Sequence, residues 1–439
     1  MKLLLILPTQ LGPDGVPIRR RKASVNLNLN LPLLAGLTPR DVDIRIVNDY
    51  VEEAHPDWDV DLVGITTLMT TTPRAYQLAD AFRARGKTVV LGGFHASAMP
   101  EEAAQHADAV VIGEADEVWP RLIDDFRSGR LRPLYTAERL PEMAGNPTPR
   151  YDLVPKNQYM VEVYPVESSR GCPLDCDYCA VTRFHGGHHR LRPIGEIVRD
   201  IRATNSRYIA FIDDNIIGHK SHARELFEAL KKLNIRWMAQ STMYLADDED
   251  LLDAAVASGL RFVWIGIESI KPAHLDQVHR KINQVDDFSR RIREFRRRGL
   301  LVGANMMFGF DDETREDYEA TYRFLVENRV IPFLYILTPI PGTPLYDRME
   351  SEGRVLHHDW SRYTSYETVI QPKNFSPAEL NDLYFNLAGR LFDFRNNFRR
   401  TIPTTRLSNL KEDLAIRTAA FAVGMSVGWA VRHRWPTYW

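Results

Sequence analysis

The chain has three cysteines, Cys172, Cys176 and Cys179, and all of them lie in one short stretch, SRGCPLDCDYC (169–179). Thiolates are soft ligands suited to zinc, copper or iron–sulfur clusters, so this spacing indicates a metal centre. A disulfide framework fits poorly, because one thiol would stay unpaired and the closed loops would be very short. The cysteine pattern therefore predicts a metal-binding protein of the reducing cytoplasm.

Two kinds of metal centre suit three clustered thiols. A structural zinc site takes four ligands, and His185, His188 or His189 in FHGGHHR could supply the fourth. A 4Fe-4S cluster held by three cysteines leaves one iron open to a small molecule, whereas electron-transfer clusters normally use four. The missing fourth cysteine favours a catalytic 4Fe-4S cluster, and a zinc site is the alternative. A separate role of the histidines in metal binding or proton relay also stays open.

The cysteines follow the first of six predicted βα units. Six such units in succession predict a barrel, complete or partial, with its active site at the carboxyl ends of the strands. The cysteine loop therefore lies where this fold places its catalysis. The predicted strands are 161–168, 208–213, 236–241, 262–268, 301–308 and 333–338, and the helices between them are 194–203, 223–233, 249–258, 286–298 and 313–327.

Shorter strand and helix patterns occupy the first 130 residues. They predict a parallel sheet covered on both faces, with a ligand outside the carboxyl ends of the strands. Those ends read TTLMTTT (66–72), GGFHAS (92–97) and GEAD (113–116), which would let a large flat ligand approach the backbone. Ordinary βα turns are the alternative. The predicted strands are 2–7, 43–47, 62–66, 88–91 and 109–112, with helices at 73–85 and 101–106.

The predicted fold is therefore α/β with a second, barrel-like unit. We expect a doubly wound, Rossmann-like parallel sheet over 1–135, a proline-rich linker over 136–160, a partial (βα)6 TIM-like barrel over 161–345 and a mostly helical accessory region over 346–439.

The charge pattern gives no sign of a nucleic-acid partner. The formal net charge is −2. The basic stretch RRIREFRRRG (290–299) falls on a predicted barrel helix with Ile292 and Phe295 inward, which favours a solvated helix face. We expect no nucleic acid to bind.

One segment near the C-terminus is apolar enough to contact a membrane. TAAFAVGMSVGWAV (418–431) is uncharged and is shorter than the ~20 residues that span a bilayer. A helix packed on the body of the protein is the first interpretation, and an interfacial anchor is the second. The start of the chain, MKLLLILPTQLG, reads as a first strand rather than a signal peptide. We therefore expect a cytoplasmic protein, with peripheral membrane contact through the C-terminal helix as the open alternative.

RGCPLDCDYC on the first strand-to-helix loop of a six-unit barrel resembles the radical S-adenosylmethionine (SAM) superfamily, in its branch with an N-terminal cobalamin (B12)-binding domain. The resemblance spans about residues 1–350. It implies that the three cysteines hold a 4Fe-4S cluster whose open iron chelates SAM. An electron from the cluster would then cleave SAM to a 5′-deoxyadenosyl radical.

The resemblance also implies positions that bind SAM. The acidic pair in FIDDNIIG (211–218) would accept hydrogen bonds from the SAM amino group, although a helix N-cap is the alternative. WIGIES (264–269) would contact ribose or the methionyl part, and the backbone of GANMMFGFDDET (303–314) the adenine. For that segment and TPIPGTPLYD (338–347), turn chemistry is the alternative. The implied SAM-binding residues are Tyr178, Asp213, Asp214, Glu268, Ser269 and Phe308.

For cobalamin, the strand ends of the N-terminal domain are the implied site. Many cobalamin domains carry an Asp-x-His-x-x-Gly motif after the first strand, but here the loop reads PTQLGPDG (8–15) without histidine. Members of this branch commonly hold cobalamin without a protein imidazole. The implied cobalamin-binding residues are Thr66, Thr67, Gly92, Gly93, His95 and Glu114.

The leading hypothesis is a cobalamin-dependent radical SAM methyltransferase that acts on an unactivated carbon of a small molecule, with a lipid-like or pigment substrate indicated by the apolar C-terminal segment. An external electron donor such as flavodoxin or ferredoxin is implied. The alternatives are a radical SAM cyclase or oxidoreductase without methyl transfer, and a non-catalytic cobalamin or iron–sulfur sensor. No catalytic side chain is predicted. A second three-cysteine cluster, as in RNA-modifying methylthiotransferases, is excluded because the N-terminal domain, residues 1–135, has no cysteine.

Overall fold

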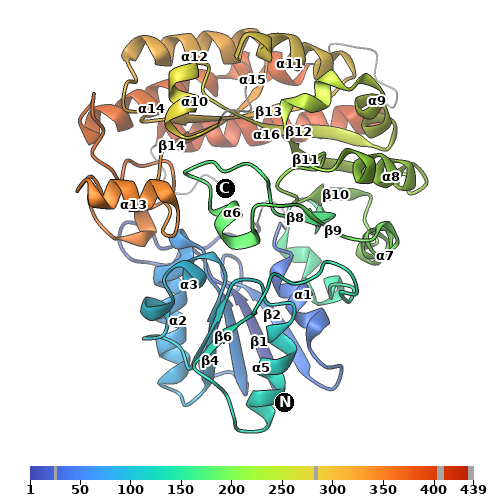
Figure 1. Cartoon of the computed structure of the whole chain (residues 1–439), viewed down its shortest axis with the longest axis vertical. Helices are drawn as coiled ribbons and strands as arrows, with labels where there is room; N and C mark the ends of the chain where they lie inside the picture. The colour runs from blue at the N-terminus through green and yellow to red at the C-terminus, as the bar shows by residue number, and fades with distance from the viewer. Residues whose placement is uncertain (24–26, 281–284, 403–409, 434–439) are drawn as a thin grey trace.

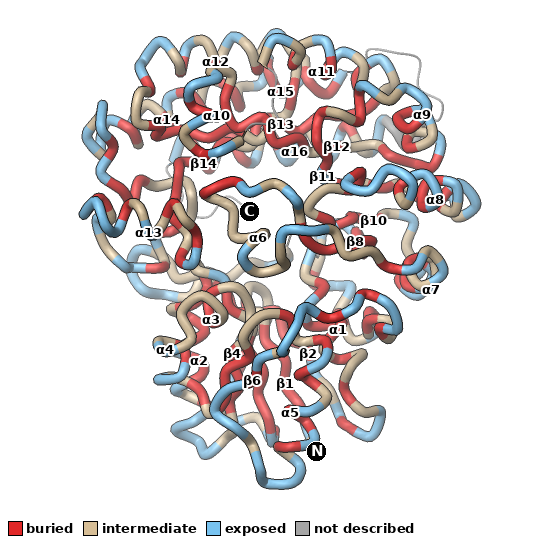
Figure 2. The backbone as a smooth tube through the Cα atoms, in the orientation of Figure 1, coloured by how far each residue is buried: buried red, intermediate tan, exposed pale blue. Residues whose placement is uncertain are grey.

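The computed structural model describes residues 1–23, 27–280, 285–402 and 410–433. Two α/β bodies lie one above the other along the long axis of the molecule, with the N-terminal body at one end (Figure 1). Each body is built on a six-stranded sheet, and the segment that carries the cysteines lies between them. The strands of both sheets are largely buried (Figure 2). The predicted α/β fold with two successive parallel-sheet units is confirmed.

The N-terminal sheet is parallel throughout, in the order β2-β1-β3-β4-β5-β6. Alternate residues of β1 face two apolar cores, since Leu4 and Ile6 pack on the side of α2 and Leu3 and Leu5 on the side of α1 and α5. Burial on both faces is what a doubly wound sheet requires. The elements are β1 (Lys2–Leu7), α1 (Asn30–Leu37), β2 (Asp43–Asn48), β3 (Leu62–Thr66), η1 (Met69–Thr71), α2 (Thr72–Arg83), β4 (Thr88–Gly92), α3 (Phe94–Ala98), α4 (Pro100–Ala103), β5 (Ala109–Ile112), α5 (Val118–Arg127) and β6 (Leu134–Thr136).

The second sheet is also parallel, in the order β14-β13-β12-β11-β10-β7. β7 and β14 are the two edges of this sheet, so the barrel is open rather than closed. The prediction of a partial barrel is confirmed. The elements are β7 (Tyr164–Val166), α7 (Ile194–Thr204), β10 (Tyr208–Phe211), α8 (Lys220–Lys231), β11 (Arg236–Ser241), α9 (Glu249–Ala257), β12 (Leu260–Glu268), α10 (Pro272–Gln277), α11 (Phe288–Arg297), β13 (Leu301–Phe308), α12 (Arg315–Glu327) and β14 (Ile331–Ile336).

Helix α11 carries the basic stretch of the sequence. Phe288, Ile292 and Phe295 point into the core. Arg291 and Arg290 pair with Asp247 at 2.7 Å and 3.0 Å. These arginines therefore serve contacts within the barrel.

The C-terminal region is mostly helical and closes the β14 edge of the sheet. Residues of α14 and α16 join the same apolar core as β14, and the Tyr384 hydroxyl donates to the Leu334 carbonyl at 3.0 Å. One helical segment, Leu414–Arg432, is long and apolar enough to cross a membrane, and about one third of its apolar stretch is buried in the protein. The elements are α13 (Pro344–Ser351), η6 (Trp360–Arg362), α14 (Pro377–Leu391), α15 (Phe394–Thr401) and α16 (Leu410–Arg432).

Candidate functional site

The cysteine loop leaves the short strand β8 (Ser169–Arg170) and ends at helix α6 (Ala180–His185); β8 pairs antiparallel with β9 (Arg190–Leu191). Gly171 has a φ of +91°, and a Cβ there would lie 2.4 Å from the carbonyl oxygen of His188. Only glycine fits a left-handed backbone approached this closely. The glycine therefore fixes the sharp turn between β8 and the first cysteine.

All three thiols are free and lie on this loop. Burial and the neighbouring thiols raise the pKa of Cys179 to about 12, and burial raises the pKa of Cys172. Arg280 donates a hydrogen bond to the sulfur of Cys176 at 3.4 Å. Within the described ranges, no three His, Cys, Asp or Glu side chains are gathered into a group that could hold a metal ion. To hold a metal centre, the three thiols would therefore have to turn toward one another. Their chemistry, three thiols with a guanidinium next to Cys176, suits an iron–sulfur cluster.

The histidines after the cysteines have other neighbours. His185 Nδ1 lies 2.8 Å from Oε1 of Glu114. The ring of His189 covers Gly218, where a Cβ would lie 1.7 Å from it, and His188 is exposed. The zinc alternative therefore has no support in the placement of these side chains.

Glu268 stands at the end of β12, next to the cysteine loop. Its φ is +66°, which is uncommon for a residue other than glycine, and the pairing of β12 with β13 shifts register beside it. Burial raises the pKa of this carboxyl group. It accepts a hydrogen bond from Tyr178, and Nη2 of Arg280 lies 3.9 Å from its Oε1. The strained backbone thus brings a buried acid, an aromatic ring and a guanidinium together beside Cys176.

The two predicted aspartates differ in their surroundings. Both oxygens of Asp213 accept from the Ser168 backbone, at 3.0 and 3.1 Å, and the Ser168 and Ser169 hydroxyls donate at 2.6 and 2.7 Å. Burial raises the pKa of Asp213 to about 6 despite these donors. Asp214 accepts only from the Gly171 backbone, at 3.1 Å, among the hydrogen bonds of the described residues. Asp213 therefore anchors the entry to the cysteine loop, and Asp214 keeps a free oxygen.

Ser269 and Phe308 are held by partners of their own. The Ser269 hydroxyl lies 2.9 Å from Nδ1 of His274. The Phe308 ring packs in the core against Tyr318, with centroids 5.0 Å apart, so only its backbone is at the strand end. The next residue, Gly309, donates its amide hydrogen to Glu313 at 2.6 Å.

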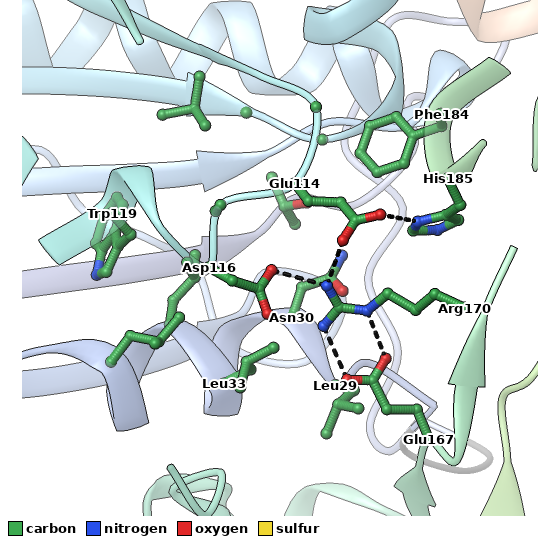
Figure 3. A pocket seen from close by; sticks show the side chains of 18 of the residues that line it. Leu29, Asn30, Leu33, Glu114, Asp116, Trp119, Glu167, Arg170, Phe184 and His185 are labelled. Carbon is green, nitrogen blue, oxygen red and sulfur yellow. Dashed lines mark hydrogen bonds and ion pairs between the residues drawn. The ribbon is translucent and has the colours of Figure 1, made fainter. Parts of the chain in front are cut away.

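A cavity of about 1040 Å³, including its solvent-open part, runs from the N-terminal sheet to the cysteine loop (Figure 3). Its inner end is apolar, with Leu33 of α1 and Trp119 of α5 in the wall. Its outer end is polar, because Arg170, Glu167 and Asp214 line it there. Such a cavity suits a ligand with an apolar part and a polar part.

The predicted cobalamin-binding residues divide between this cavity and the turns beneath it. Thr66, Gly92, Gly93 and Glu114 line the cavity. Gly93 has a φ of +102°, and a Cβ there would lie 2.6 Å from the Thr67 carbonyl oxygen, so no larger residue fits.

Thr67 and His95 lie outside the lining of the large cavity. The Thr67 hydroxyl donates to the Gly92 carbonyl at 2.9 Å and accepts from Ala96, which ties β3 to β4. His95 is 1% exposed, its Nε2 lies 3.1 Å from Oε1 of Glu102, and it lines a second cavity. Neither side chain faces the cavity that Gly92 and Gly93 share.

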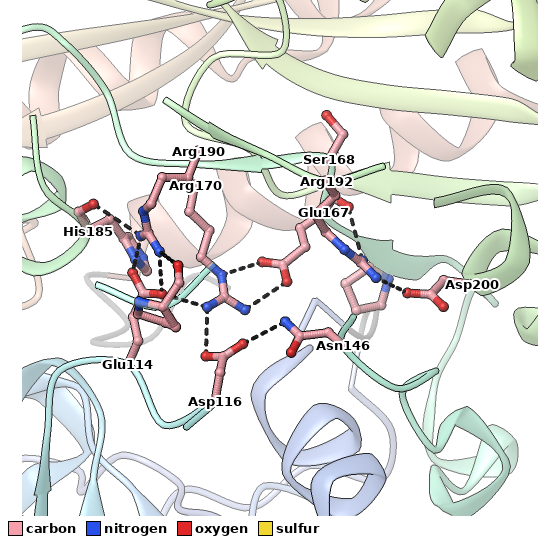
Figure 4. Close-up of polar contacts among 12 residues, drawn as sticks. Glu114, Asp116, Asn146, Glu167, Ser168, Arg170, His185, Arg190, Arg192 and Asp200 are labelled. Atoms are coloured by element: carbon pink, nitrogen blue, oxygen red, sulfur yellow. Dashed lines mark hydrogen bonds and ion pairs between the residues drawn. The ribbon is translucent and has the colours of Figure 1, made fainter. Parts of the chain in front are cut away.

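Glu114 connects the N-terminal sheet to the cysteine loop (Figure 4). Its Oε2 accepts from Arg170 at 2.7 Å and from Arg190 at 3.0 Å, and its Oε1 faces His185. Burial by itself would raise the pKa of Glu114, but the hydrogen bonds from His185 and Arg190 and the charge of Arg170 lower it to about 2. The carboxylate is thus fully ionised and bound between two guanidinium groups.

Arg170 is the centre of this network. Its Nη1 also donates to Asp116 at 2.8 Å, and its Nε and Nη2 donate to Glu167 at 2.9 Å and 2.8 Å. The side chain is nearly buried, and Asn146, which lies between β6 and β7, donates to the other oxygen of Asp116 at 2.8 Å. The residue two positions before Cys172 is therefore bound to both bodies and, through Asp116, to the segment that connects them. We refer to Glu114, Asp116, Glu167, Arg170 and Arg190 as the interdomain ion network.

Sequence patterns did not indicate several residues of the site. Arg280 lies 104 positions after Cys176, and Arg170 lies 56 positions after Glu114. No local periodicity marks such pairs, because the fold alone brings them together. The position of Arg170 directly before the cysteine motif predicts that it belongs to the frame of the loop, but nothing in the sequence predicts its carboxylate partners.

Two family models match the chain. The radical SAM superfamily model matches residues 166–325, and the B12 binding domain model matches residues 33–123. Bacteriochlorophyllide d C-8(2)-methyltransferase of Chlorobaculum tepidum is 30% identical over 410 residues, which cover 89% of this chain and 91% of the relative. Bacteriochlorophyllide d C-12(1)-methyltransferase of the same organism is 28% identical, covering 84% and 83%. Hopanoid C-2 methylase of Rhodopseudomonas palustris is 26% identical, covering 75% and 65%.

Solved structures of two proteins have the same fold over nearly the whole chain. TsrM from Kitasatospora setae, a radical SAM methyltransferase, superposes with a TM-score of 0.67 at 16% identity, covering 99% of this chain and 98% of TsrM. OxsB, a cobalamin-dependent SAM radical enzyme, superposes with a TM-score of 0.69 at 13% identity, covering 97% and 71%.

Proposed function

The chain belongs to the radical SAM superfamily, in the branch with an N-terminal B12-binding domain, and from this premise we propose that it is a cobalamin-dependent C-methyltransferase of a small molecule. One observation carries the proposal: the three-cysteine loop meets the carboxyl edge of the N-terminal sheet. Phe184 of α6 stacks on Phe94 of α3 there, with ring centroids 4.2 Å apart. A cofactor at that edge and a cofactor on the loop would therefore both reach the space between the bodies. The division into segments 1–135, 136–160, 161–345 and 346–439 is part of the proposal.

The cofactors are a 4Fe-4S cluster, SAM and cobalamin, as the family implies. When bound, the cluster supplies the electron that cleaves SAM, and cobalamin supplies the methyl group. Cys172, Cys176 and Cys179 would hold the cluster. Arg280 would offset the negative charge of the Cys176 thiolate, because it already donates to that sulfur.

For SAM, we propose a site beside the cysteine loop. The free oxygen of Asp214 is placed to accept from an ammonium group, whereas Asp213 is saturated by its serine donors. Glu268 is buried with a raised pKa, so hydroxyl donors of a ribose would stabilise its ionised form. Tyr178 would lie against the adenine, and Ser269 and the Phe308 backbone complete the proposed set.

For cobalamin, the large cavity is the proposed site. Its apolar inner end, between Leu33 and Trp119, suits the aromatic base of the nucleotide tail, and Gly92 and Gly93 let the corrin side approach the backbone. Thr66 and Glu114 line the same cavity. Thr67 and His95 would act indirectly, by holding the turns after β3 and β4 that border the cavity.

A direct experiment tests the function. Protein reconstituted anaerobically with iron, sulfide and cobalamin is given SAM carrying a labelled methyl group, bacteriochlorophyllide d as a probe, and dithionite or reduced flavodoxin as the electron source. We expect 5′-deoxyadenosine and a labelled pigment. Failure to form 5′-deoxyadenosine would contradict an enzymatic role and would favour the alternative of a non-catalytic sensor. Formation of 5′-deoxyadenosine from a cobalamin-loaded protein without label transfer would favour a cyclase or oxidoreductase.

We also propose that the protein contacts anionic membranes through α15 and α16. Phe394 and Phe398 of α15 are 62% and 53% exposed, and Trp429 of α16 is 52% exposed. Arg395 and Arg399 stand beside the two phenylalanines, and the sequence is uncharged from 418 to 431. Exposed aromatic rings with neighbouring arginines are typical of interfacial helices.

Vesicle sedimentation tests this contact. We expect the protein to sediment with vesicles of mixed phosphatidylcholine and phosphatidylglycerol. The double variant Phe394→Ser with Phe398→Ser should bind about tenfold or more weakly, since each buried ring contributes roughly 1.5–3 kcal/mol. A wild-type protein that stays in the supernatant at every lipid concentration would contradict the proposal.

A further inference from the structure

A second cavity, of about 820 Å³ including its solvent-open part, lies where the N-terminal sheet, the cysteine loop and the end of the barrel meet. Its walls come from η1 and α3 of the N-terminal body, from α6, and from the loop after β14. Met69, Phe94, Phe184, Ile340 and Pro341 make most of it apolar. Ala180, which follows Cys179, is part of its lining, so the cavity lies directly beside the cluster loop.

Two ionisable side chains line this cavity, His95 and Arg183. Burial lowers the pKa of His95, so the imidazole is neutral there. Arg183 is exposed, and among the described residues no carboxylate lies within ion-pair distance of it. The neighbouring Arg170 and Arg190, by contrast, are both bound to carboxylates. A mostly apolar cavity thus contains one positive charge that no carboxylate of the described residues pairs with.

We propose that Arg183 binds a carboxylate of the substrate, and that the substrate is a flat, apolar molecule with one acidic side chain. This rests on the proposed function, because it names the substrate class of that same site. The planar guanidinium donates two parallel hydrogen bonds to a carboxylate, while the stacked rings of Phe94 and Phe184 give a flat apolar wall. A tetrapyrrole acid has both features, and a neutral polycyclic lipid lacks the anion.

The phosphate of cobalamin is a second source of an anion at this position. Phe184 lines both cavities, so the two ligands would lie on either side of one ring. Cobalamin carries its phosphate on the nucleotide tail, which the proposed function places in the large cavity. We therefore assign Arg183 to the substrate, and the experiment below separates the two sources.

Binding to the cobalamin-loaded holoprotein is the test, with pyropheophorbide a as the acidic probe and its methyl ester as the neutral one. Fluorescence titration measures both affinities without turnover. We expect Arg183→Gln to weaken binding of the acid by about 10- to 100-fold, because a hydrogen bond to a charged group is lost, and to leave the ester unchanged. Arg183→Lys keeps the charge but loses the second of the two parallel hydrogen bonds, so it should restore only part of the affinity. The matched control is Arg130→Gln, at an exposed arginine after α5.

Three outcomes would overturn the proposal. Equal affinity of the wild type for acid and ester would show that no carboxylate is bound. An unchanged affinity of Arg183→Gln for the acid would show that Arg183 does not bind it. A loss of bound cobalamin from Arg183→Gln at unchanged thermal stability would assign the residue to the phosphate. Formation of 5′-deoxyadenosine is measured separately, so failure of the proposed function is distinguished from failure of this subsite.

Discussion

Replacing Cys176 by alanine is expected to lower the formation of 5′-deoxyadenosine by about 10³-fold or more, which corresponds to at least about 4 kcal/mol of activation free energy. The reason is that three thiols are the whole cysteine content of the chain, so no other cysteine can replace a lost ligand. The same result is expected for Cys172→Ala and Cys179→Ala. Iron and sulfide content, the absorbance of the cluster and product formation are measured together.

Asp175→Asn is the matched control for the cysteine variants. Asp175 is exposed and lies between the first two cysteines, so the substitution changes a side chain in the loop and keeps every thiol. We expect it to bind iron and to cleave SAM at the wild-type rate. A Cys176→Ala protein that assembles a cluster and forms 5′-deoxyadenosine like this control would contradict the proposed ligand set. Thermal unfolding of each variant shows whether the fold is retained.

Most strands were predictable because they are apolar runs, and the central ones, such as β3 and β4, are buried on both faces. The short edge strand β6, in which only Tyr135 is buried, was not predicted. Deviations occur where a strand leaves its sheet. The first barrel strand was expected over 161–168, but β7 covers only Tyr164–Val166, because the next residues turn away to form β8. The helix expected over 101–106 is the single turn α4, which begins at Pro100. Both differences come from tertiary contacts that local patterns do not contain.

The acidic pair after β10 shows that a residue type alone does not predict its hydrogen-bond partners. A helix N-cap was one interpretation of Asp213 and Asp214, and it is wrong, because α8 begins only at Lys220 and is capped by His219. Asp213 instead accepts hydrogen bonds from Ser168 and Ser169, where β7 gives way to β8. Its role depends on Ser168, which lies 45 positions earlier in the chain. The residue type was predictable, but its partner was not.

The ion pairs were the least predictable part of the site. Glu114 was expected at a cofactor because it follows a strand end, and it does line the large cavity. Its carboxylate, however, is bound by Arg170 and Arg190. Likewise, nothing in the sequence around Arg183 distinguishes it from the paired arginines nearby. Which cations are paired depends on how the two bodies meet.

Replacing Arg170 by methionine is expected to lower the free energy of unfolding by about 3–5 kcal/mol, because three carboxylates would remain buried without their shared cation. The side chain is 7% exposed and lies within 2.9 Å of oxygens of Glu114, Asp116 and Glu167. Methionine keeps an unbranched side chain of similar length without the charge. Urea unfolding measures the loss. We further expect faster proteolysis of the linker 136–160, since the network holds the two bodies together.

Arg192→Met is the matched control for that experiment. Arg192 is 3% exposed and pairs with Asp200 at 2.8 Å, but both residues lie within the barrel body. A comparable loss of stability without faster cleavage of the linker is expected there. If Arg192→Met exposes the linker as much as Arg170→Met does, the network stabilises the fold in general and does not specifically join the bodies.

Acid pH gives an independent measure of the same network. The pKa of Glu114 is lowered from 4.5 to about 2 in the folded protein, so its ionisation favours folding fully above about pH 4.5, and the contribution is lost as the pH falls toward 2. Without Arg170, the pKa of this carboxyl group should rise. The difference in unfolding free energy between wild type and Arg170→Met is therefore expected to shrink as the pH falls below 4.5. A difference that stays constant from pH 7 to about 3 would mean that Glu114 is not held ionised by Arg170.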